Sequence, residues 1–355
     1  MNNSRYRVEI RNGSGQLIAD LSGRALRRRI EKRRNRGDNI ILSYDADDIL
    51  RLAKSINANI WTDLLAENIN EVRVIRDDTV IAAGQLSYAY PRIEEGDKRI
   101  IDIRTTSWLD LLAKRFTATP YTFSGIDAGT IGWTLINDTQ NLTDGNFGIT
   151  QGVIQTSVNR DRTYEIDKNI YQLLVQLSEV QNGFDFEVTW NKVFNVYYPR
   201  IGSRRTDITF TYPGNIRSIG FERDGMQMAN QIIGRGQGTG ADVLKSAATD
   251  TVLRGIYKLR QDIVDWPDVV LLQTLTEHAN GELTDRKRFL DIPDLTLDGT
   301  SNPVYGTYQI GDEVQIRVEN NDLFAPINDY FRIDATTLEI DQNDKETVSL
   351  RMTRI

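Results

Sequence analysis

The residues of this chain that could do chemistry exclude several kinds of catalysis. There is no cysteine, which rules out disulfides, thiolate metal sites and cysteine nucleophiles. His278 is the only histidine, so a multi-histidine metal cage is impossible and at most one Ser-His-acid triad could form. With Asn280 and Glu282 after it, near the expected end of a helix, His278 is typical of a capping or surface histidine. We therefore expect no catalytic residue, no cofactor and no metal site.

Carboxylates are numerous but do not single out a site. Glycoside hydrolysis needs two that face each other across a cleft, and the 50 Asp and Glu residues allow many pairs. Asp45, Asp47 and Asp48 could bind a hard cation. They stand where a helix is expected to begin, however, and acids there offset the positive end of the helix. We favour helix capping over metal binding.

A basic run over residues 24–36, RALRRRIEKRRNR, is the main candidate for phosphate binding. Its context disfavours this, because the chain has a formal net charge of −7 and the run lies between strand signals. Exposed edge strands carry such charges to prevent unwanted pairing, and they can also form salt bridges to a neighbouring subunit. We predict subunit or solvent contact, rather than nucleic-acid binding, for Arg27, Arg28, Arg29, Lys32, Arg33 and Arg34.

A glycine-rich stretch, GRGQGTG over residues 234–240, loosely matches a dinucleotide fingerprint and is followed by the helix-like ADVLKSA. A dinucleotide site needs a parallel βαβ unit, whereas the neighbouring segments look antiparallel. The Lys-Ser/Thr pair of a phosphate-binding loop is also missing. We predict a flexible turn or inter-subunit loop at Gly234, Gly236, Gly238 and Gly240.

The elements that would hold these residues are mainly strands. Apolar residues alternate through most of residues 4–116, interrupted by an expected helix over residues 45–55. A hairpin is expected to turn at Asp77 and Asp78, with a bulge at Gly84, before a helix over residues 107–116. The segments 131–142 and 168–180 have helical spacing and are expected to cover a sheet.

An aromatic hairpin is expected over residues 184–198, and strict alternation predicts that Phe184, Phe186 and Trp190 lie in a core. Short strands follow near residues 208–212 and 218–222, then a helix over residues 268–280. The last segments, near 314–318, 331–333, 338–340 and 348–352, alternate as antiparallel strands. No stretch approaches the roughly 20 apolar residues needed to span a bilayer.

These patterns predict a mainly β fold with an α+β insertion. We expect antiparallel barrel or sandwich domains over residues 1–117 and 204–355, the latter with a helical insertion. Between them, a helix-covered sheet domain is expected over residues 118–203. The two outer domains share a strand-rich style that suggests two copies of one barrel.

The order of these features resembles the central tail hub proteins, or minor tail and baseplate hub proteins, of long-tailed bacteriophages and related tail-like particles. The first domain carries RRNRGDNIILSYD, VRVIRDDTVIAAG and LLAKRF. The middle carries LINDTQNLTDGNFGI and DKNIYQLLVQLSEVQNGFDFEV. The last third carries ANQIIGRGQG, YQIGDEVQIRV and FRIDATTLEID. The resemblance covers nearly the whole chain.

The resemblance implies a non-enzymatic structural virion protein with two tail-tube-like domains in each chain. Three copies would form a pseudo-sixfold ring at the tail tip, assembled in the bacterial cytoplasm. The ring would contact the tail tube or distal tail protein and tip or fibre proteins, and DNA would pass through it without specific binding. The net charge predicts an acidic lumen that repels the duplex. Two other hypotheses are a tail-associated cell-wall hydrolase and a carbohydrate-binding or receptor-binding tail module.

Overall fold

The protein is described by a computed structural model that covers residues 5–23, 25–226, 228–287, 290–319, 323 and 326–354. Arg24, the first residue of the basic run, lies outside the described residues. Within these ranges the chain is mainly antiparallel β-sheet with a few helices, which confirms the predicted fold class.

The first part of the chain is a sheet flanked by short helices. The strands are β1 (Tyr6–Arg11), β2 (Leu17–Asp20), β3 (Ala25–Arg33), β4 (Asn39–Asp45), β5 (Glu71–Arg76), β6 (Thr79–Glu94) and β7 (Lys98–Thr106). The helices are α1 (Ala46–Ser55), the π-helical turn η1 (Ile60–Leu64) and the 3-10 helix η2 (Asp110–Lys114). The predicted helix over residues 107–116 is thus only a 3-10 turn, while the hairpin at Asp77 and Asp78 is confirmed, both residues having positive φ.

Gly84 does not form the predicted bulge, because the register of β5 and β6 shifts beside Val74 and Ile75 instead. A Cβ atom at Gly84 would lie 2.8 Å from the carbonyl oxygen of Thr106. Glycine is needed there because the backbone of β7 approaches closely.

The last part of the chain contributes β13 (Arg204–Tyr212), β14 (Ile216–Asp224), β18 (Leu290–Asp298), β19 (Glu313–Val318), β20 (Ile327–Asp341) and β21 (Glu346–Arg354). Together with the first strands they form a 13-stranded sheet among the described residues, in the order β14-β18-β21-β20-β3-β4-β7-β6-β5-β1-β2. From this order β19 branches off to pair with β20, and β13 pairs with β19. β20 is one long strand with a register shift between Ile333 and Ala335, where we had expected two strands.

The middle of the chain packs two helices against small sheets. Its elements are β8 (Tyr121–Asp127), α2 (Ala128–Gln140), β9 (Thr150–Gln151), β10 (Asn159–Tyr164), α3 (Ile170–Ser178), β11 (Asp185–Val188) and β12 (Val193–Tyr197). Both predicted helices and the aromatic hairpin are confirmed, and Phe184 and Phe186 are buried. Trp190 is 40% exposed, so its predicted core position is wrong. β11 ends at Val188, and Trp190 belongs to the turn.

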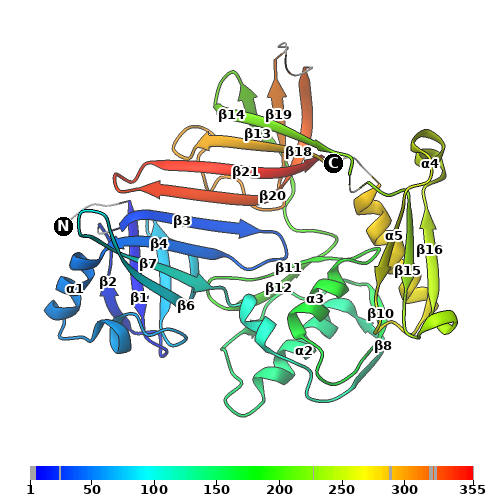
Figure 1. The fold of residues 1–355 in the computed structure, drawn as a ribbon, viewed down its shortest axis with the longest axis horizontal. Helices are drawn as coiled ribbons and strands as arrows, with labels where there is room; N and C mark the ends of the chain where they lie inside the picture. The colour runs from blue at the N-terminus through cyan, green and yellow to red at the C-terminus, as the bar shows by residue number, and fades with distance from the viewer. Residues whose placement is uncertain are drawn as a thin grey trace.

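A small region lies beside the middle region, at the right of Figure 1. It contains β15 (Gln231–Arg235), η3 (Gly240–Asp242), β16 (Lys245–Thr249), α4 (Thr251–Tyr257), β17 (Gln261–Asp265) and α5 (Leu272–Arg286). β15 is central, antiparallel to β16 and parallel to β17. The sequence did not predict α4 or β17, and ADVLKSA is not a helix.

The apolar cores follow this division. The largest combines residues from both ends of the chain, for example Tyr6 and Ile30 with Leu338 and Val348. A second belongs to the middle region, and a small third one lies between α5 and β15–β16. Among the described helices, none has the length and apolar character that crossing a membrane requires.

Candidate functional site: the seam between the two ends of the chain

β3 joins the first and last parts of the chain into one sheet. It pairs antiparallel with β20 from Arg27↔Asp341 to Arg33↔Ala335, and with β4 along its other edge (Figure 1). Because both edges of β3 are occupied, the interpretation of this basic strand as an exposed edge is wrong. We call the β3–β20 junction and the ion pairs around it the seam.

Arg28 lies inside the seam, only 1% exposed. Its Nη1 donates to Oδ1 of Asp344 at 3.1 Å and to the carbonyl oxygen of Asp341 at 3.3 Å. The guanidinium also lies 5.9 Å from the ring centre of Tyr6. A buried charge is tolerated only with such partners. Arg28 therefore ties β3 to the turn between β20 and β21.

The other residues of the basic run are mostly paired within the chain. The ion pairs are Arg27–Glu339 at 2.5 Å, Arg29–Glu31 at 2.5 Å, Lys32–Asp38 at 3.4 Å and Arg34–Asp334 at 3.1 Å. Arg33 is exposed and forms no ion pair with a described residue. Arg27, Arg33 and Arg34 remain exposed enough for the predicted subunit contact.

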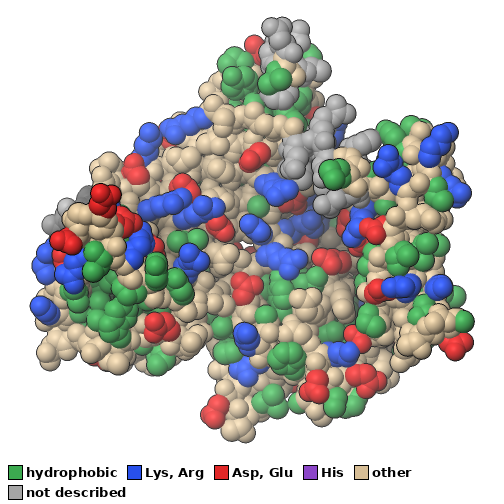
Figure 2. All heavy atoms as spheres, viewed as in Figure 1, with side chains coloured by type: hydrophobic (Ala, Val, Ile, Leu, Met, Phe, Trp, Pro, Cys, Tyr) green, Lys and Arg blue, Asp and Glu red, His purple; other side chains and the backbone are tan. Residues whose placement is uncertain are grey.

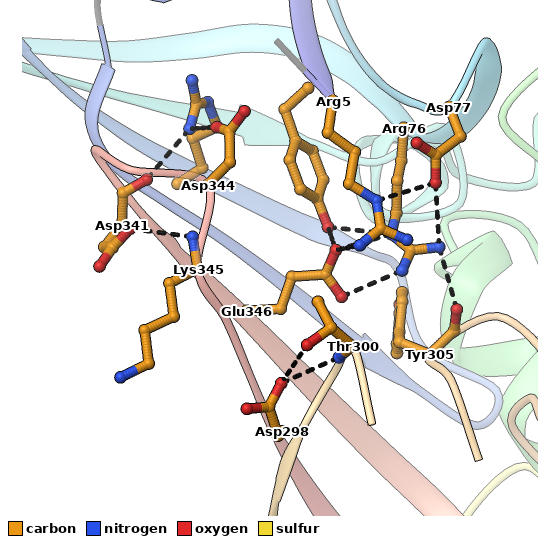
Figure 3. A network of polar contacts seen from close by, with 12 residues as sticks. Arg5, Arg76, Asp77, Asp298, Thr300, Tyr305, Asp341, Asp344, Lys345 and Glu346 are labelled. Atoms are coloured by element: carbon orange, nitrogen blue, oxygen red, sulfur yellow. Dashed lines mark hydrogen bonds and ion pairs between the residues drawn. The ribbon is translucent and has the colours of Figure 1, made fainter. Parts of the chain in front are cut away.

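Glu346 is the most enclosed charge of the seam, with 0% exposure (Figure 3). Its Oε1 accepts hydrogen bonds from Tyr6 Oη at 2.8 Å and Arg76 Nε at 2.9 Å, and pairs with Arg5 Nη1 at 3.0 Å. Its Oε2 accepts from Arg76 Nη2 at 3.0 Å. Burial, and then the charge of Glu346, raise the pKa of Tyr6. One carboxylate of β21 is thus held entirely by β1, β5 and the residue before β1.

Asp185 of the middle region is likewise a buried carboxylate held by groups from other parts of the chain. Its carboxylate accepts from Arg34 Nη1 at 3.2 Å, Asn35 Nδ2 at 3.1 Å and the Ile201 amide at 2.9 Å, and it pairs with Arg332. Figure 2 shows Lys and Arg side chains gathered where the long sheet meets the middle region. Asp185 therefore fixes the middle region against β20 and against the turn that follows β3.

His278 lies at the contact between the middle region and α5. It is 4% exposed, its ring stacks on Trp266 with centroids 5.0 Å apart, and nearby Arg160 donates to Glu277 at 3.0 Å. Burial, and then the charges of Arg162 and Arg160, lower the pKa of His278 to about 3. The expectation of a capping or surface histidine is wrong, and no sequence pattern announced the burial.

The glycine-rich stretch is packed. Gly234 lies within β15, where an added Cβ would come within 3.1 Å of Trp266. At Gly236 it would lie 2.6 Å from the carbonyl oxygen of Val269, and at Gly238 2.5 Å from that of Asp242. Gly240 has open space around it and begins η3. The interpretation of all four as one loop is therefore wrong at Gly234.

The acidic cluster before α1 acts as a helix cap. Asp45 is the N-cap, and its carboxylate accepts from the amide of Asp47 at 2.8 Å. No group of three or more His, Asp or Glu residues that could hold a metal occurs in the ranges that the structure describes. Asp45 thus caps the helix as predicted, while Asp47 and Asp48 pair with Arg99 and Arg51.

The long sheet leaves several strand edges unpaired by described strands. β2, at one end of the order, pairs only with β1, and β14, at the other end, pairs only with β18. β13 pairs only with β19. Within the sheet, β5 pairs with β6 only as far as Gln85, so residues 87–94 of β6 pair only with β7. Unpaired edges carry free N–H and C=O groups that can accept a strand from another chain.

The fold has relatives among solved structures. A 43 kDa tail protein of prophage MuSo2 from Shewanella oneidensis superimposes with a TM-score of 0.67 and 13% identity, over 98% of this chain and 98% of that one. For a tail protein from Neisseria meningitidis the TM-score is 0.64, with 14% identity, over 99% and 97% of the two chains. Prophage tail protein gp18 from Listeria monocytogenes gives 0.58 and 12%, over 97% and 94%.

The fold is that of phage tail proteins. No protein-family model matches the sequence, and no curated protein sequence does either. At these identities the likeness establishes the fold alone. The sequence did not predict the roles of the seam residues Glu346, Arg76 and Asp185. Each is a charged residue within a strand, and its burial and ion pairs depend on partners far away in the chain.

Proposed function

We propose that this chain is a non-enzymatic structural protein of the virion that forms the hub ring at the tail tip. The observation that supports this most is the continuous sheet, in which β3 and β20 join the two ends of the chain and which leaves unlike strand edges free, among them those of β6 and β14. Contacts between unlike surfaces generate rings when the rotation closes. Three copies, joined edge to edge, would then alternate six tube-like domains, two from each chain, around a central passage.

The domain limits 1–117, 118–203 and 204–355 are part of this proposal, with the first and last as tube-like domains. The hub would adapt the tail tube or distal tail protein to tip or fibre proteins and give passage to DNA. Its pairing edges would be residues 87–90 of β6 and the outer edge of β14. Pro91 has no N–H and would end the ladder on β6.

Cross-linking tests this geometry directly, because the chain has no cysteine. Ser87→Cys combined with Ser218→Cys should give covalent trimers on oxidation, since a disulfide forms only when the two Cα atoms approach to about 4.4–6.8 Å. Gly220→Cys in place of Ser218→Cys samples a second register. Negative-stain images should show a ring with a central hole.

Ser87→Cys combined with Ser124→Cys serves as the control, because Ser124 is exposed on β8, which belongs to a different sheet from β6 and β14, and this pair should stay uncross-linked. The trimeric hub is wrong if neither test pair cross-links and the mass in solution is that of a monomer at every concentration.

A cell-wall hydrolase is a second candidate because Glu179 and Asp285 line the same cleft, of about 750 Å³. Burial raises the pKa of both carboxyls, the pattern expected of a general acid. Release of soluble peptidoglycan fragments by the protein, abolished by Glu179→Gln or Asp285→Asn but not by Glu95→Gln, would favour it. Activity absent in all four proteins would exclude it.

A carbohydrate-binding module is favoured by one observation, the exposed Trp190. It lines a cleft of about 330 Å³ with Trp108 and Tyr197, and aromatic faces in a cleft suit sugar rings. Glycan-array binding lost on Trp190→Ala would support this function, whereas no binding by the intact protein would count against it.

A further inference from the structure

One broad face of the long sheet is open to solvent and polar. Along β3, the side chains of Ile30 and Lys32 point to the core side, so Arg27, Arg29, Glu31 and Arg33 occupy the opposite face. The register carries this face onto β20 through Glu339 and Asp341. It continues over β21 and β18 on one side and over β4, β7 and β6 on the other.

This face interleaves the two signs of charge. Its cations include Arg27, Arg29, Arg33, Arg92, Arg104 and Arg351, and its carboxylates include Glu31, Asp102, Asp294, Asp298, Glu339 and Asp341. Neither sign dominates. The net charge of −7 is therefore not concentrated on this face.

Three of these six cations, Arg27, Arg29 and Arg92, are held by a carboxylate of the same face. Arg27 pairs with Glu339 at 2.5 Å across the seam, and Arg29 pairs with Glu31 at 2.5 Å and with Glu339 at 3.4 Å. On neighbouring strands Arg92 pairs with Asp102, and Arg217 at the rim pairs with Asp298. Arg104 lies over the ring of Tyr88, 5.1 Å from its centre.

We infer that this face is the wall along which duplex DNA passes, and that Glu31 and Glu339 keep the DNA from binding by holding Arg27 and Arg29. The inference rests on the proposed hub. It revises the acidic lumen expected from net charge, because a wall on which the two signs of charge are interleaved presents little field of either sign beyond about 8–10 Å at physiological salt. A cation already paired with a carboxylate displaces few counterions from a phosphate.

The test removes the two carboxylates. The double variant Glu31→Gln and Glu339→Gln leaves Arg27 and Arg29 unpaired, and should bind a fluorescein-labelled 30-base-pair duplex at least tenfold more tightly than the unaltered protein at 50 mM salt. Two released cations should steepen the slope of log K against log salt by about 1.8, at roughly 0.9 per phosphate contact. Fluorescence anisotropy measures both quantities.

The matched control changes the net charge equally but off this face. Asp268→Asn with Asp265→Asn removes the partners of Lys168 and Arg235, which lie before α3 and on β15. This control should bind DNA no more than twofold better than the unaltered protein. Equal gains in the two double variants would overturn the inference, because net charge alone would then explain them.

Measuring mass in the same samples separates the two proposals. If the protein is a trimeric ring but the variant at Glu31 and Glu339 binds DNA no more tightly, the proposal that this face lines the DNA passage is wrong and the trimeric hub still stands. If every sample is monomeric, the proposal of a trimeric hub is wrong, whatever the affinity for DNA.

Discussion

The seam and the small region of β15–β17 and α5 are held together in opposite ways. Around the seam, Glu346 and Arg28 are buried and paired with charged residues, beside a large apolar core that both ends of the chain build. The small region has a small apolar cluster of Ala229, Ile232, Ala248, Ala279 and Leu283, with Leu275 also buried on α5. Two of its apolar side chains are largely exposed: Ile263 on the outer face of its sheet is 53% exposed, and Val252 on α4 is 71% exposed.

This difference in packing indicates that the long sheet is the more rigid part and that the small region can unfold locally. Regions with few buried apolar contacts open at a lower free energy than the core strands. A ring must hold its radius, so rigidity belongs in the sheet that would form it. The small region, which touches the middle one through Arg160 and Glu277, can open without loosening that sheet.

The largest expected effect comes from Glu346→Gln. The substitution keeps the shape but removes the buried counter-charge of Arg5 and Arg76, which leaves them only the exposed Asp77, and this costs about 3 kcal/mol. Urea unfolding should show this as a lower midpoint with an unchanged slope. Glu95→Gln, an exposed control, should change the free energy of unfolding by less than about 0.5 kcal/mol. A Glu346→Gln protein as stable as that control would show that the seam network contributes nothing.

The second prediction concerns Leu275→Ala in α5. Leu275 is fully buried and packs close to Gly234, so its truncation should cost about 2–4 kcal/mol. The loss should stay local, with faster hydrogen exchange in β15, β16 and β17 and unchanged exchange in β3 and β20. Leu17→Ala, at a half-exposed position, is the control. Faster exchange across the seam strands as well would break the comparison, because the two regions would then unfold as one unit.

A smaller effect should come from acidification, through His278. Its folded pKa of about 3 lies below its ordinary value of 6.5, so the unfolded chain binds the proton first as the pH falls. Stability is complete above pH 6.5 and is lost progressively toward pH 3, by about 2 kcal/mol between pH 7 and pH 5. His278→Gln should remove this part of the pH dependence, as urea unfolding at the two pH values can show. An identical pH dependence in both proteins would contradict the buried neutral imidazole.

The sequence predicted turns, helix caps and helices well where they depend on residues that are close together in the chain. The hairpin at Asp77 and Asp78, the cap at Asp45 and the helices α2 and α3 depend on neighbouring residues, and all were found. It failed where a distant partner decides. Trp190 fits an alternating core pattern, yet the strand stops before it, and His278 looks like a helix-end residue until Trp266 covers it.

The seam shows the same limit at the site itself. The basic run was recognised from its composition, but the expectation that it formed an exposed edge ignored β20, some 300 residues further along the chain. Carboxylates such as Glu339 and Asp344 become partners only through the β3–β20 register. Pairings of this kind follow from the fold and could not be inferred from spacing.

The smallest expected effect concerns the N-cap of α1, at the border of the long sheet. It tests whether loss of this cap destabilises α1 alone or the sheet as well. Asp45 caps α1, and Asp45→Ala should cost about 1 kcal/mol, because the amide of Asp47 loses its acceptor. Asp45→Asn retains an acceptor oxygen and should cost less, which separates capping from charge. Hydrogen exchange should speed up in α1 alone, because β4 and β7 keep their own pairing on either side of Asp45. If exchange also rose along β3 and β20, the helix would be supporting the seam, and the rigidity assigned to the sheet would depend on a single surface cap.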